Sequence, residues 1–257
     1  MPTIDKALGL LDHFSGTAPE IGLAEFRELS GFDKATVHRY LTTLRQCGYV
    51  EQNPDNKAYR LGPALIRLAT VREKTVPLKR IAAPLLGALA DQIGELVHAA
   101  LPQQTGMSSL YAKDGGHGST RVDFDESEVL PLHATSSGLA FLAFGPVEFF
   151  QSVISKALPA YTFATPNTSE KVKSLVSNSK KAGYAYAEQL YESEVCSVAV
   201  PFFNIAGTAI GTLAIATPRS RMNRNMYAKK LADTSQRFTR QLGGSVPDDL
   251  LEIWNSL

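Results

Sequence analysis

The feature that most constrains the fold of this chain is a series of three short helical patterns near its start. Apolar residues recur every three or four positions over residues 4–14, 23–29 and 37–44. Gly31 follows the second pattern as a helix stop, and Asp33 precedes the third as an N-cap. Helices separated by so short a turn predict a helix-turn-helix.

A hairpin is predicted directly after the third helix. Residues 49–52 and 57–61 have the composition of strands, and the Asn-Pro-Asp-Asn sequence at 53–56 consists of residues that favour turns. Three helices followed by a hairpin predict a winged helix-turn-helix domain over residues 1–62.

A linker helix and a larger domain are predicted beyond the hairpin. Residues 63–75 have a helical pattern that Pro77 ends, which predicts a linker helix over 63–77. Residues 78–257 mix helical and strand periodicity, so we expect an α+β domain built around an antiparallel sheet. Its expected helices cover 78–93, 136–144, 169–181 and 226–242, and its expected strands cover 96–101, 107–113, 196–203 and 208–216.

Composition excludes several classes of protein. The 257 residues are 44% hydrophobic and 20% charged, as expected of one or two globular domains rather than of a disordered chain. The apolar stretches end well before the ~18 residues that cross a bilayer, and the start lacks the apolar core of a secretory signal. We therefore expect a cytoplasmic protein without a membrane partner. Cys47 and Cys196 lie far apart without clustered ligands, so neither a disulfide nor a metal site is expected.

The third helix carries the residues expected to contact nucleic acid. A net charge of +1 excludes binding of polyanions through bulk charge, but residues 34–47 contain lysine and arginine without any carboxylate. On a recognition helix, Arg and His donate to base edges, and Thr and Lys contact phosphates or bases. The alternative is a protein-interaction module on which these side chains are only solvated. We expect contacts with double-stranded DNA from Lys34, Thr36, His38, Arg39, Thr42 and Thr43 on the helix, and from Lys57 and Tyr59 on the wing.

An enzymatic function is weighed against this interpretation. Cys196, His133 and Glu188 have the residue types of a nucleophile, a base and an orienting group. Cys196, however, begins an apolar strand without a basic neighbour, which favours a buried thiol, and His133 stands between apolar residues, which favours a bond to backbone. The sequence motifs of nucleotide sites and zinc proteases are absent. We expect neither catalysis nor a cofactor; the alternative is a metabolite-handling enzyme or sensor with a vestigial helical domain.

Segments spread over nearly the whole chain resemble the IclR family of bacterial transcriptional regulators. Each segment alone is a weak match, but their order and spacing together are specific. The N-terminal segments resemble the family's three helices and its wing: IDKALGLL at 4–11, LAEFRELSG at 23–31, KATVHRYLTTL at 34–44, GYV at 48–50 and YRLG at 59–62. The later segments are similar to its effector-binding domain: LPLHAT at 130–135, AGYA at 182–185, CSVAVP at 196–201 and GTLAI at 211–215.

The resemblance implies a GAF-like effector-binding domain and a homodimer or a tetramer. It also implies a DNA-binding regulator, with repression favoured over activation, whose operator affinity is switched by a small organic acid or an aromatic metabolite. Backbone N–H groups at a helix start favour an anion, which is consistent with the family's ligand position. Carried over position by position, the pocket has a floor of Thr135, Ser136 and Ser137, and walls of Ser119, Val122 and Leu130, of Glu188 and Cys196, and of Ala214 and Ala216.

The chain departs from the family's small-keto-acid binders at two of these positions. Ala214 and Ala216 present methyl groups where those proteins present serines, which removes two hydroxyl partners for a carboxylate. The change favours a less polar, aromatic effector. The alternative is that both alanines are packed under a helix in a filled core.

Two charged segments have no assigned role. Acidic residues crowd 123–128, and basic residues crowd 219–230. Such segments are usually solvated surface; the functional alternatives are a lid over the pocket entrance for the acidic segment and a second contact surface for the basic one.

Overall fold

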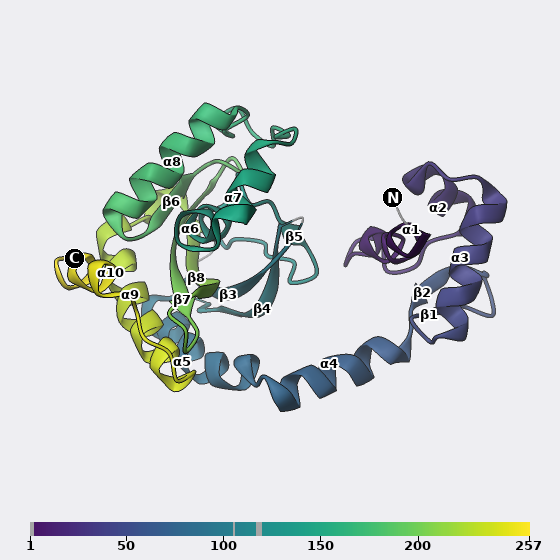
Figure 1. Cartoon of the computed structure of the whole chain (residues 1–257), viewed down its shortest axis with the longest axis horizontal. Helices are drawn as coiled ribbons and strands as arrows, with labels where there is room; N and C mark the ends of the chain where they lie inside the picture. The colour runs from purple at the N-terminus through teal and green to yellow at the C-terminus, as the bar shows by residue number, and fades with distance from the viewer. Residues whose placement is uncertain (1–2, 105, 117–119) are drawn as a thin grey trace. The chain divides into compact units, whose positions relative to one another are not determined.

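The computed structural model divides the chain into two compact units, residues 1–77 and 78–257 (Figure 1). The structure describes residues 3–104, 106–116 and 120–257. In this part of the chain no helix is both long enough and apolar enough to span a membrane.

The first unit contains the predicted helices and hairpin. Its elements are α1 (Thr3–Leu8), a short 3-10 turn (Leu11–His13), α2 (Leu23–Ser30), α3 (Lys34–Gln46), β1 (Val50–Gln52), β2 (Tyr59–Leu61) and α4 (Pro63–Thr75). The prediction of one helix from residue 4 to residue 14 is wrong. The chain turns at Gly9, a poor helix former, and the next residue, Leu10, enters the core with 1% of its surface exposed.

Local capping interactions produce the turn between α2 and α3. Gly31 ends α2 in the left-handed region at φ 69°, where a side chain is strained. Asp33 then caps α3, because its carboxylate accepts the backbone N–H of Thr36 at 2.9 Å and the Thr36 hydroxyl at 2.7 Å. These two hydrogen bonds hold the pKa of the Asp33 carboxyl below its ordinary value. The helix buries its apolar side, Val37, Tyr40, Leu41 and Leu44, in the core of the unit.

The hairpin of β1 and β2 is bonded to the segment that precedes α2. Ile21 forms a β-bridge with Tyr59 of β2, with N–H to carbonyl distances of 2.9 Å in both directions. The Glu20 carboxylate accepts the side-chain amides of Asn53 and Asn56 in the turn, at 3.0 and 2.9 Å. These bonds attach the hairpin to the segment that precedes α2.

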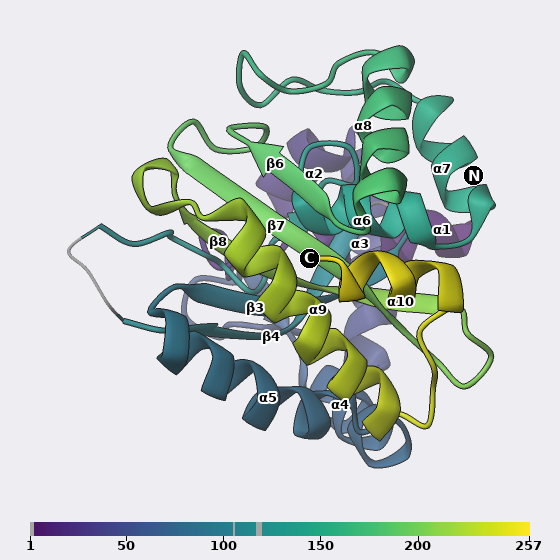
Figure 2. The same cartoon turned by 90° about the vertical axis from the view of Figure 1, so that its left-hand side faces the viewer.

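The second unit is built on an antiparallel sheet, which Figure 2 shows with α5 and α9 in front of it. Its described residues form six strands in the order β5-β4-β3-β8-β7-β6. The bounds of the strands are β3 Leu96–Gln103, β4 Gly106–Asp114, β5 Val129–Leu130, β6 Ala185–Glu188, β7 Val195–Phe203 and β8 Ala209–Pro218.

Helices cover both faces of this sheet, so the unit has two cores. One core lies against α5 (Leu78–Ile93), α9 (Arg224–Gln241) and α10 (Asp248–Asn255), and it takes alternate strand residues such as Val97, Val198, Leu213 and Ile215. The other lies against α6 (Ser136–Phe144), α7 (Val147–Ile154) and α8 (Ser169–Ala182), and it takes Ala100, Ala199 and Ala214. A 3-10 turn (Arg219–Arg221) joins β8 to α9.

The architecture agrees with the predicted α+β fold, an N-terminal helix-turn-helix followed by a domain with an antiparallel sheet. The main differences in the second unit are elements that the sequence patterns did not predict: β5, α7, β6 and α10. These elements span two to eight residues each. Periodicity over so few residues does not distinguish a helix or a strand from a loop.

Candidate functional site

The predicted recognition helix α3 presents its polar residues to solvent. Lys34, His38, Arg39 and Thr43 are exposed, and Thr42 is half-buried. The hydroxyl of Thr36 is occupied by the cap on Asp33. The guanidinium carbon of Arg39 lies 5.4 Å from the centre of the Tyr40 ring. The accessible face of α3 is therefore cationic.

The two residues predicted to contact DNA from the wing, Lys57 and Tyr59, differ in their exposure to solvent. Lys57 is exposed at the hairpin turn, where its ammonium donates to the carbonyl of Pro54 at 2.7 Å. The prediction that Tyr59 contacts DNA is wrong, because this residue is only 4% exposed. Its ring packs edge-on against Phe26 with a centroid distance of 6.3 Å, so Tyr59 is part of the core of the first unit.

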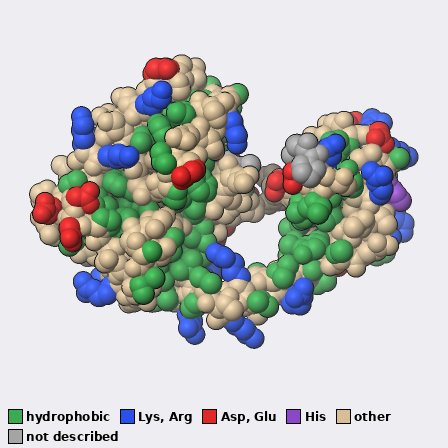
Figure 3. Space-filling model, viewed as in Figure 1, with side chains coloured by type: hydrophobic (Ala, Val, Ile, Leu, Met, Phe, Trp, Pro, Cys, Tyr) green, Lys and Arg blue, Asp and Glu red, His purple; other side chains and the backbone are tan. Residues whose placement is uncertain are grey.

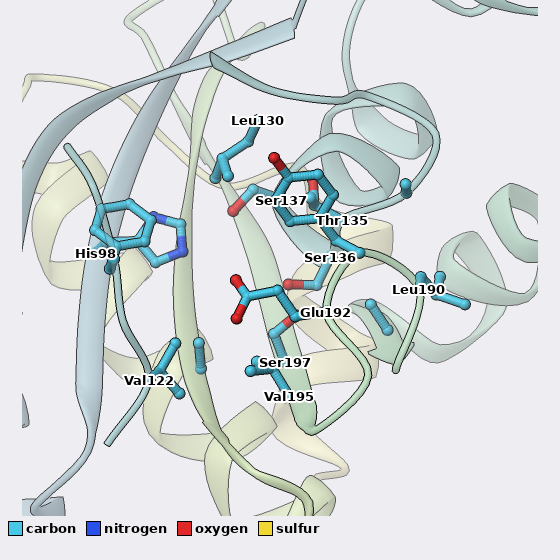
Figure 4. A pocket seen from close by; sticks show the side chains of 15 residues that line it. His98, Val122, Leu130, Thr135, Ser136, Ser137, Leu190, Glu192, Val195 and Ser197 are labelled. Carbon is cyan, nitrogen blue, oxygen red and sulfur yellow. The ribbon is translucent and has the colours of Figure 1, made fainter. Parts of the chain in front are cut away.

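A cavity opens in the second unit at the start of α6. The volume that the centre of a water-sized molecule can reach inside it is about 50 Å³, and the cavity is partly open to solvent. Figure 4 shows its walls, which come from β3, the segment before β5, the start of α6, and the β6–β7 region. The lining residues are His98, Val122, Phe124, Leu130, Ala134, Thr135, Ser136, Ser137, Ala187, Leu190, Tyr191, Glu192, Val195, Ser197 and Ala216.

The floor of the cavity is the N-terminus of α6. The Thr135 hydroxyl caps the helix by accepting the N–H of Gly138 at 3.1 Å. The N–H groups of Ser136 and Ser137 belong to the first turn, where no preceding turn supplies an acceptor. A Cβ atom at Gly138 would lie 2.3 Å from the carbonyl oxygen of Leu132, so glycine is needed for this close approach. The packing holds the start of α6 against the segment that leads into it.

Two buried polar atoms of the cavity lining have no hydrogen-bond partner among the described residues. They are Nδ1 of His98 on β3 and Oγ of Ser137 on α6. Burial lowers the pKa of His98 to about 4, so its ring is neutral at pH 7. The ring of Phe124 lies against it with a centroid distance of 4.8 Å. Buried polar groups in folded proteins are normally paired, so these two indicate a place for a ligand or for water.

A carboxylate stands at the mouth of the cavity. Figure 4 shows the Glu192 carboxylate and the nitrogen-bearing side of the His98 ring pointing into the same space. Partial desolvation, together with repulsion from the carboxylates of Glu128 and Asp123, raises the pKa of Glu192. Glu128 in turn accepts a hydrogen bond from the hydroxyl of Tyr191, another lining residue.

The predicted pocket residues divide into three groups. Val122, Leu130, Ala216 and the floor of Thr135, Ser136 and Ser137 line the cavity. Ala214 does not line it, because the residue is fully buried in the core beneath α6. The alternative of a filled core therefore describes Ala214 but not Ala216. Ser119 lies outside the described residues.

The prediction that Glu188 and Cys196 form a wall is wrong. The two residues are cross-strand partners on β6 and β7, and strand alternation directs both away from the cavity. Their neighbours Ala187, Val195 and Ser197 line it instead. Glu188 is exposed, and its carboxylate pairs with the guanidinium of Arg219 at 3.2 Å.

The residues weighed as a catalytic set do not have the surroundings of one. Burial raises the pKa of the Cys196 thiol, so the thiol remains protonated at neutral pH. His133 lies 2.9 Å from the carbonyl oxygen of Pro159 through Nε2, which is the backbone bond expected for it. In the described part of the chain no three His, Cys, Asp or Glu side chains gather so as to hold a metal ion.

Sequence reasoning missed the polar residues that distinguish this cavity. His98 had a usable signal, because it is the only polar residue of the predicted strand 96–101 and shares a face with Ala100. Glu192 had none, since it stands in a loop whose path depends on the strands at either side of it. The other missed lining residues are Phe124, Ala134, Ala187, Leu190, Tyr191, Val195 and Ser197.

The fold and these two features define a class of protein: a transcriptional regulator in which a helix-turn-helix and a ligand-binding domain share one chain. Comparison with known families agrees. Residues 3–54 match the IclR helix-turn-helix domain, and residues 72–241 match the C-terminal domain of the bacterial transcriptional regulator IclR. The chain belongs to the IclR family of bacterial transcriptional regulators and is a DNA-binding regulator of transcription.

Individual relatives cover nearly the whole chain. The Escherichia coli HTH-type transcriptional regulator XynR is 28% identical over 94% of this chain and 97% of its own length. A crystal structure described as an ICLR transcriptional regulator from Silicibacter sp. TM1040 is 35% identical, with a TM-score of 0.88 over 96% of this chain and 99% of its own. An IclR homolog from Microbacterium hydrocarbonoxydans, complexed with 4-hydroxybenzoate, shares the fold at 23% identity, with a TM-score of 0.76 over 94% of this chain and 99% of its own.

The burial of His98 predicts a pH-dependent component of stability. The pKa of the ring falls from 6.5 to about 4 on folding, so between these values the unfolded chain binds a proton that the folded chain does not. Stability that is present above pH 6.5 is therefore lost as the pH falls toward 4, by an amount on the order of 3 kcal/mol. The variant His98→Phe should lack this component.

Denaturant unfolding at a series of pH values measures the difference. The single tryptophan, Trp254, is buried in the same unit and reports its unfolding. If the wild type and His98→Phe lose stability equally between pH 7 and pH 4, the ring is not held neutral by burial.

Proposed function

We propose that this regulator is a repressor that releases its operator when a small organic acid or a related aromatic metabolite binds in the cavity at the start of α6. The observation that carries the proposal is the cavity itself, whose lining includes the first turn of α6 and two buried polar atoms without a partner among the described residues. Among the relatives, YiaJ and IclR of Escherichia coli are named transcriptional repressors. In functional terms, residues 1–62 bind DNA, 63–77 form a linker helix, and 78–257 bind the effector.

The chemistry of the cavity supports a carboxylate ligand. The N-terminus of a helix carries partial positive charge and free N–H donors, so the carboxylate belongs near Ser136 and Ser137. The body of the ligand then packs on Val122, Leu130 and Ala216, which are apolar. The complex of the Microbacterium homolog with 4-hydroxybenzoate supports the idea that a domain of this fold accepts an aromatic acid.

Release of the operator requires a difference in affinity. A ligand shifts an equilibrium between two arrangements of the DNA-binding units only if it binds one arrangement more tightly than the other. The proposed effector therefore has two measurable properties, its affinity for the cavity and its effect on operator binding, and a variant can change one without the other.

Replacement of Ala216 tests the effector site. Ala216→Leu places bulk in the cavity and should weaken binding at least tenfold for the tightest ligand found in a thermal-shift screen of organic and aromatic acids. Operator affinity without ligand should not change. Ala206→Leu, at an exposed hairpin tip, is the matched control, whereas Ala214→Leu would overpack the core. Unchanged affinity in a stably folded Ala216→Leu protein would locate the effector elsewhere.

For the DNA interface, we propose contacts from Lys34, His38, Arg39, Thr42, Thr43 and Lys57. Arg39→Ala should reduce the free energy of operator binding by about 1–3 kcal/mol, and it should relax the discrimination between bases at one position of the operator. Lys57→Ala should weaken binding to DNA of every sequence by the same factor, and it should reduce the salt dependence of binding. Arg45→Ala is the control, because the guanidinium of Arg45 bonds Gln52 within the unit at 3.2 Å.

Fluorescence anisotropy measures these effects, with labelled DNA from the region upstream of the gene that encodes this protein and at several salt concentrations. An Arg39→Ala protein with full operator affinity and unchanged base preference would contradict this docking. Absent or salt-insensitive binding by the wild type would favour the rival interpretation, a sensor or metabolite-handling enzyme with a vestigial helical domain.

We also propose a homo-oligomer, a dimer or a dimer of dimers, that spaces two recognition helices about 34 Å apart or a multiple of it on a pseudo-palindrome. Helix α4 buries no residue within the chain. Figure 3 shows hydrophobic side chains exposed along it. Leu65, Leu68 and Val71 follow one another at three-residue spacing and form an apolar stripe on one side of the helix. Leu68 and Val71 are 38% and 50% exposed. A stripe of this kind favours contact with a second copy.

Substitutions in this stripe test the oligomer. Leu68→Glu combined with Val71→Glu should give a monomer by light scattering at micromolar concentration, because each replacement buries a charge at the proposed contact. Lys74→Glu, which removes no apolar surface, should leave the assembly unchanged. A wild-type chain that is monomeric under these conditions would remove the proposal.

A further inference from the structure

The wall of the cavity opposite α6 has its own polar chemistry. His98 contributes a neutral imidazole whose Nδ1 is buried and has no partner in the described part of the chain. The ring of Phe124 packs against it in a tilted arrangement, with a centroid distance of 4.8 Å and an interplanar angle of 39°. Glu192 directs a carboxylate into the same space (Figure 4). This end of the cavity therefore offers a fixed imidazole beside an acceptor.

The α6 end offers the opposite chemistry. The N–H groups of Ser136 and Ser137 can only donate, and the unpartnered hydroxyl of Ser137 can donate as well. A ligand that satisfies both ends must place an acceptor at α6 and a donor at Glu192. A carboxylate suits the first end and is disfavoured at the second, where the carboxylates of Glu128 and Asp123 already repel that of Glu192.

A hydroxyl group fits the second end better than an amine does. A neutral imidazole has one N–H and one acceptor nitrogen, and Nδ1 is the N–H in one tautomer and the acceptor in the other. When Nδ1 is protonated, a hydroxyl accepts from the imidazole N–H and donates its one proton to the Glu192 carboxylate. When Nδ1 is not protonated, the hydroxyl donates to Nδ1 instead, and the exposed Glu192 carboxylate is hydrated. It can therefore pair with either tautomer, whereas an ammonium group can only donate.

We propose that His98 and Glu192 are specificity-determining residues that read a hydroxyl group, so that the effector is a hydroxylated monocarboxylate bound with its carboxylate at α6 and its hydroxyl at His98 and Glu192. The inference rests on the proposed function of this cavity as the effector site. The inference adds which group of the ligand each wall of the cavity recognises. It predicts that dicarboxylates as long as the hydroxylated acid are not effectors.

Matched ligands of two shapes test the proposal. The rigid set is benzoate, 4-hydroxybenzoate and terephthalate, and the flexible set is butanoate, 4-hydroxybutanoate and succinate. Calorimetry on the full chain should show, in at least one set, that the hydroxylated acid binds at least tenfold more tightly than its parent and that the dicarboxylate binds most weakly. A hydrogen bond from a buried pair accounts for a preference of this size.

Two variants connect the preference to the named residues. His98→Phe should reduce the preference for the hydroxylated acid to less than threefold while binding of the parent acid persists. Glu192→Gln should reduce the same preference and increase the affinity for the dicarboxylate severalfold, a gain that misfolding cannot produce. Glu194→Gln, an exposed carboxylate two residues along that does not line the cavity, is the matched control.

The outcomes separate the inference from the function on which it rests. Equal affinity for hydroxylated and parent acids in both sets, or a preference that survives both variants, would overturn the inference. It is also overturned if none of the six acids binds while another small molecule releases the operator, in which case the proposed function stands. If the hydroxylated acid binds as expected but operator affinity does not change, the inference holds and the switching function fails.

Discussion

The second unit depends on the pairing of β8 with a strand on each side of it. Because β3 and β7 both hydrogen-bond to β8, no residue of this strand can change the face to which it points. Leu213 and Ile215 fill the core against α5 and α9, while Ala214 and Ala216 point toward α6. Two methyl groups there let the start of α6 approach the sheet without filling the space in front of it, and the cavity is the space that remains.

The same alternation explains which parts of the site could be predicted from sequence. The floor at 135–137 was predictable because a helix start is a local feature that Thr135 marks by its capping residue type. The wall on β7 was not: the strand was predicted to within one residue, but Cys196 was assigned to the face that Ser197 occupies. A shift of one residue in a strand moves a side chain to the other face. A strand can therefore be predicted correctly while the residues that face the cavity are assigned wrongly.

In the first unit, by contrast, most signals are local and the sequence prediction held for the helices of the helix-turn-helix. The turn at Gly31 and the cap at Asp33 involve residues within three positions of each other, so their chemistry is visible in the sequence. Tyr59 shows where this fails. Its burial results from Phe26 and Ile21, which are more than thirty positions away, and an aromatic residue on a short wing gives no sign of such partners.

The polar groups of the cavity are arranged so that they distinguish its two ends. Partial charge from a helix terminus falls off within the first turn, so attraction for an anion is confined to the space near Ser136 and Ser137. At the mouth, the raised pKa of Glu192 shows that negative charge is already unfavourable there. The neutral ring of His98 adds no positive charge to offset it at pH 7. On the proposed function, we therefore expect an acid to bind in one orientation, with its carboxylate at α6. The chemical group at its other end would then distinguish one acid from another.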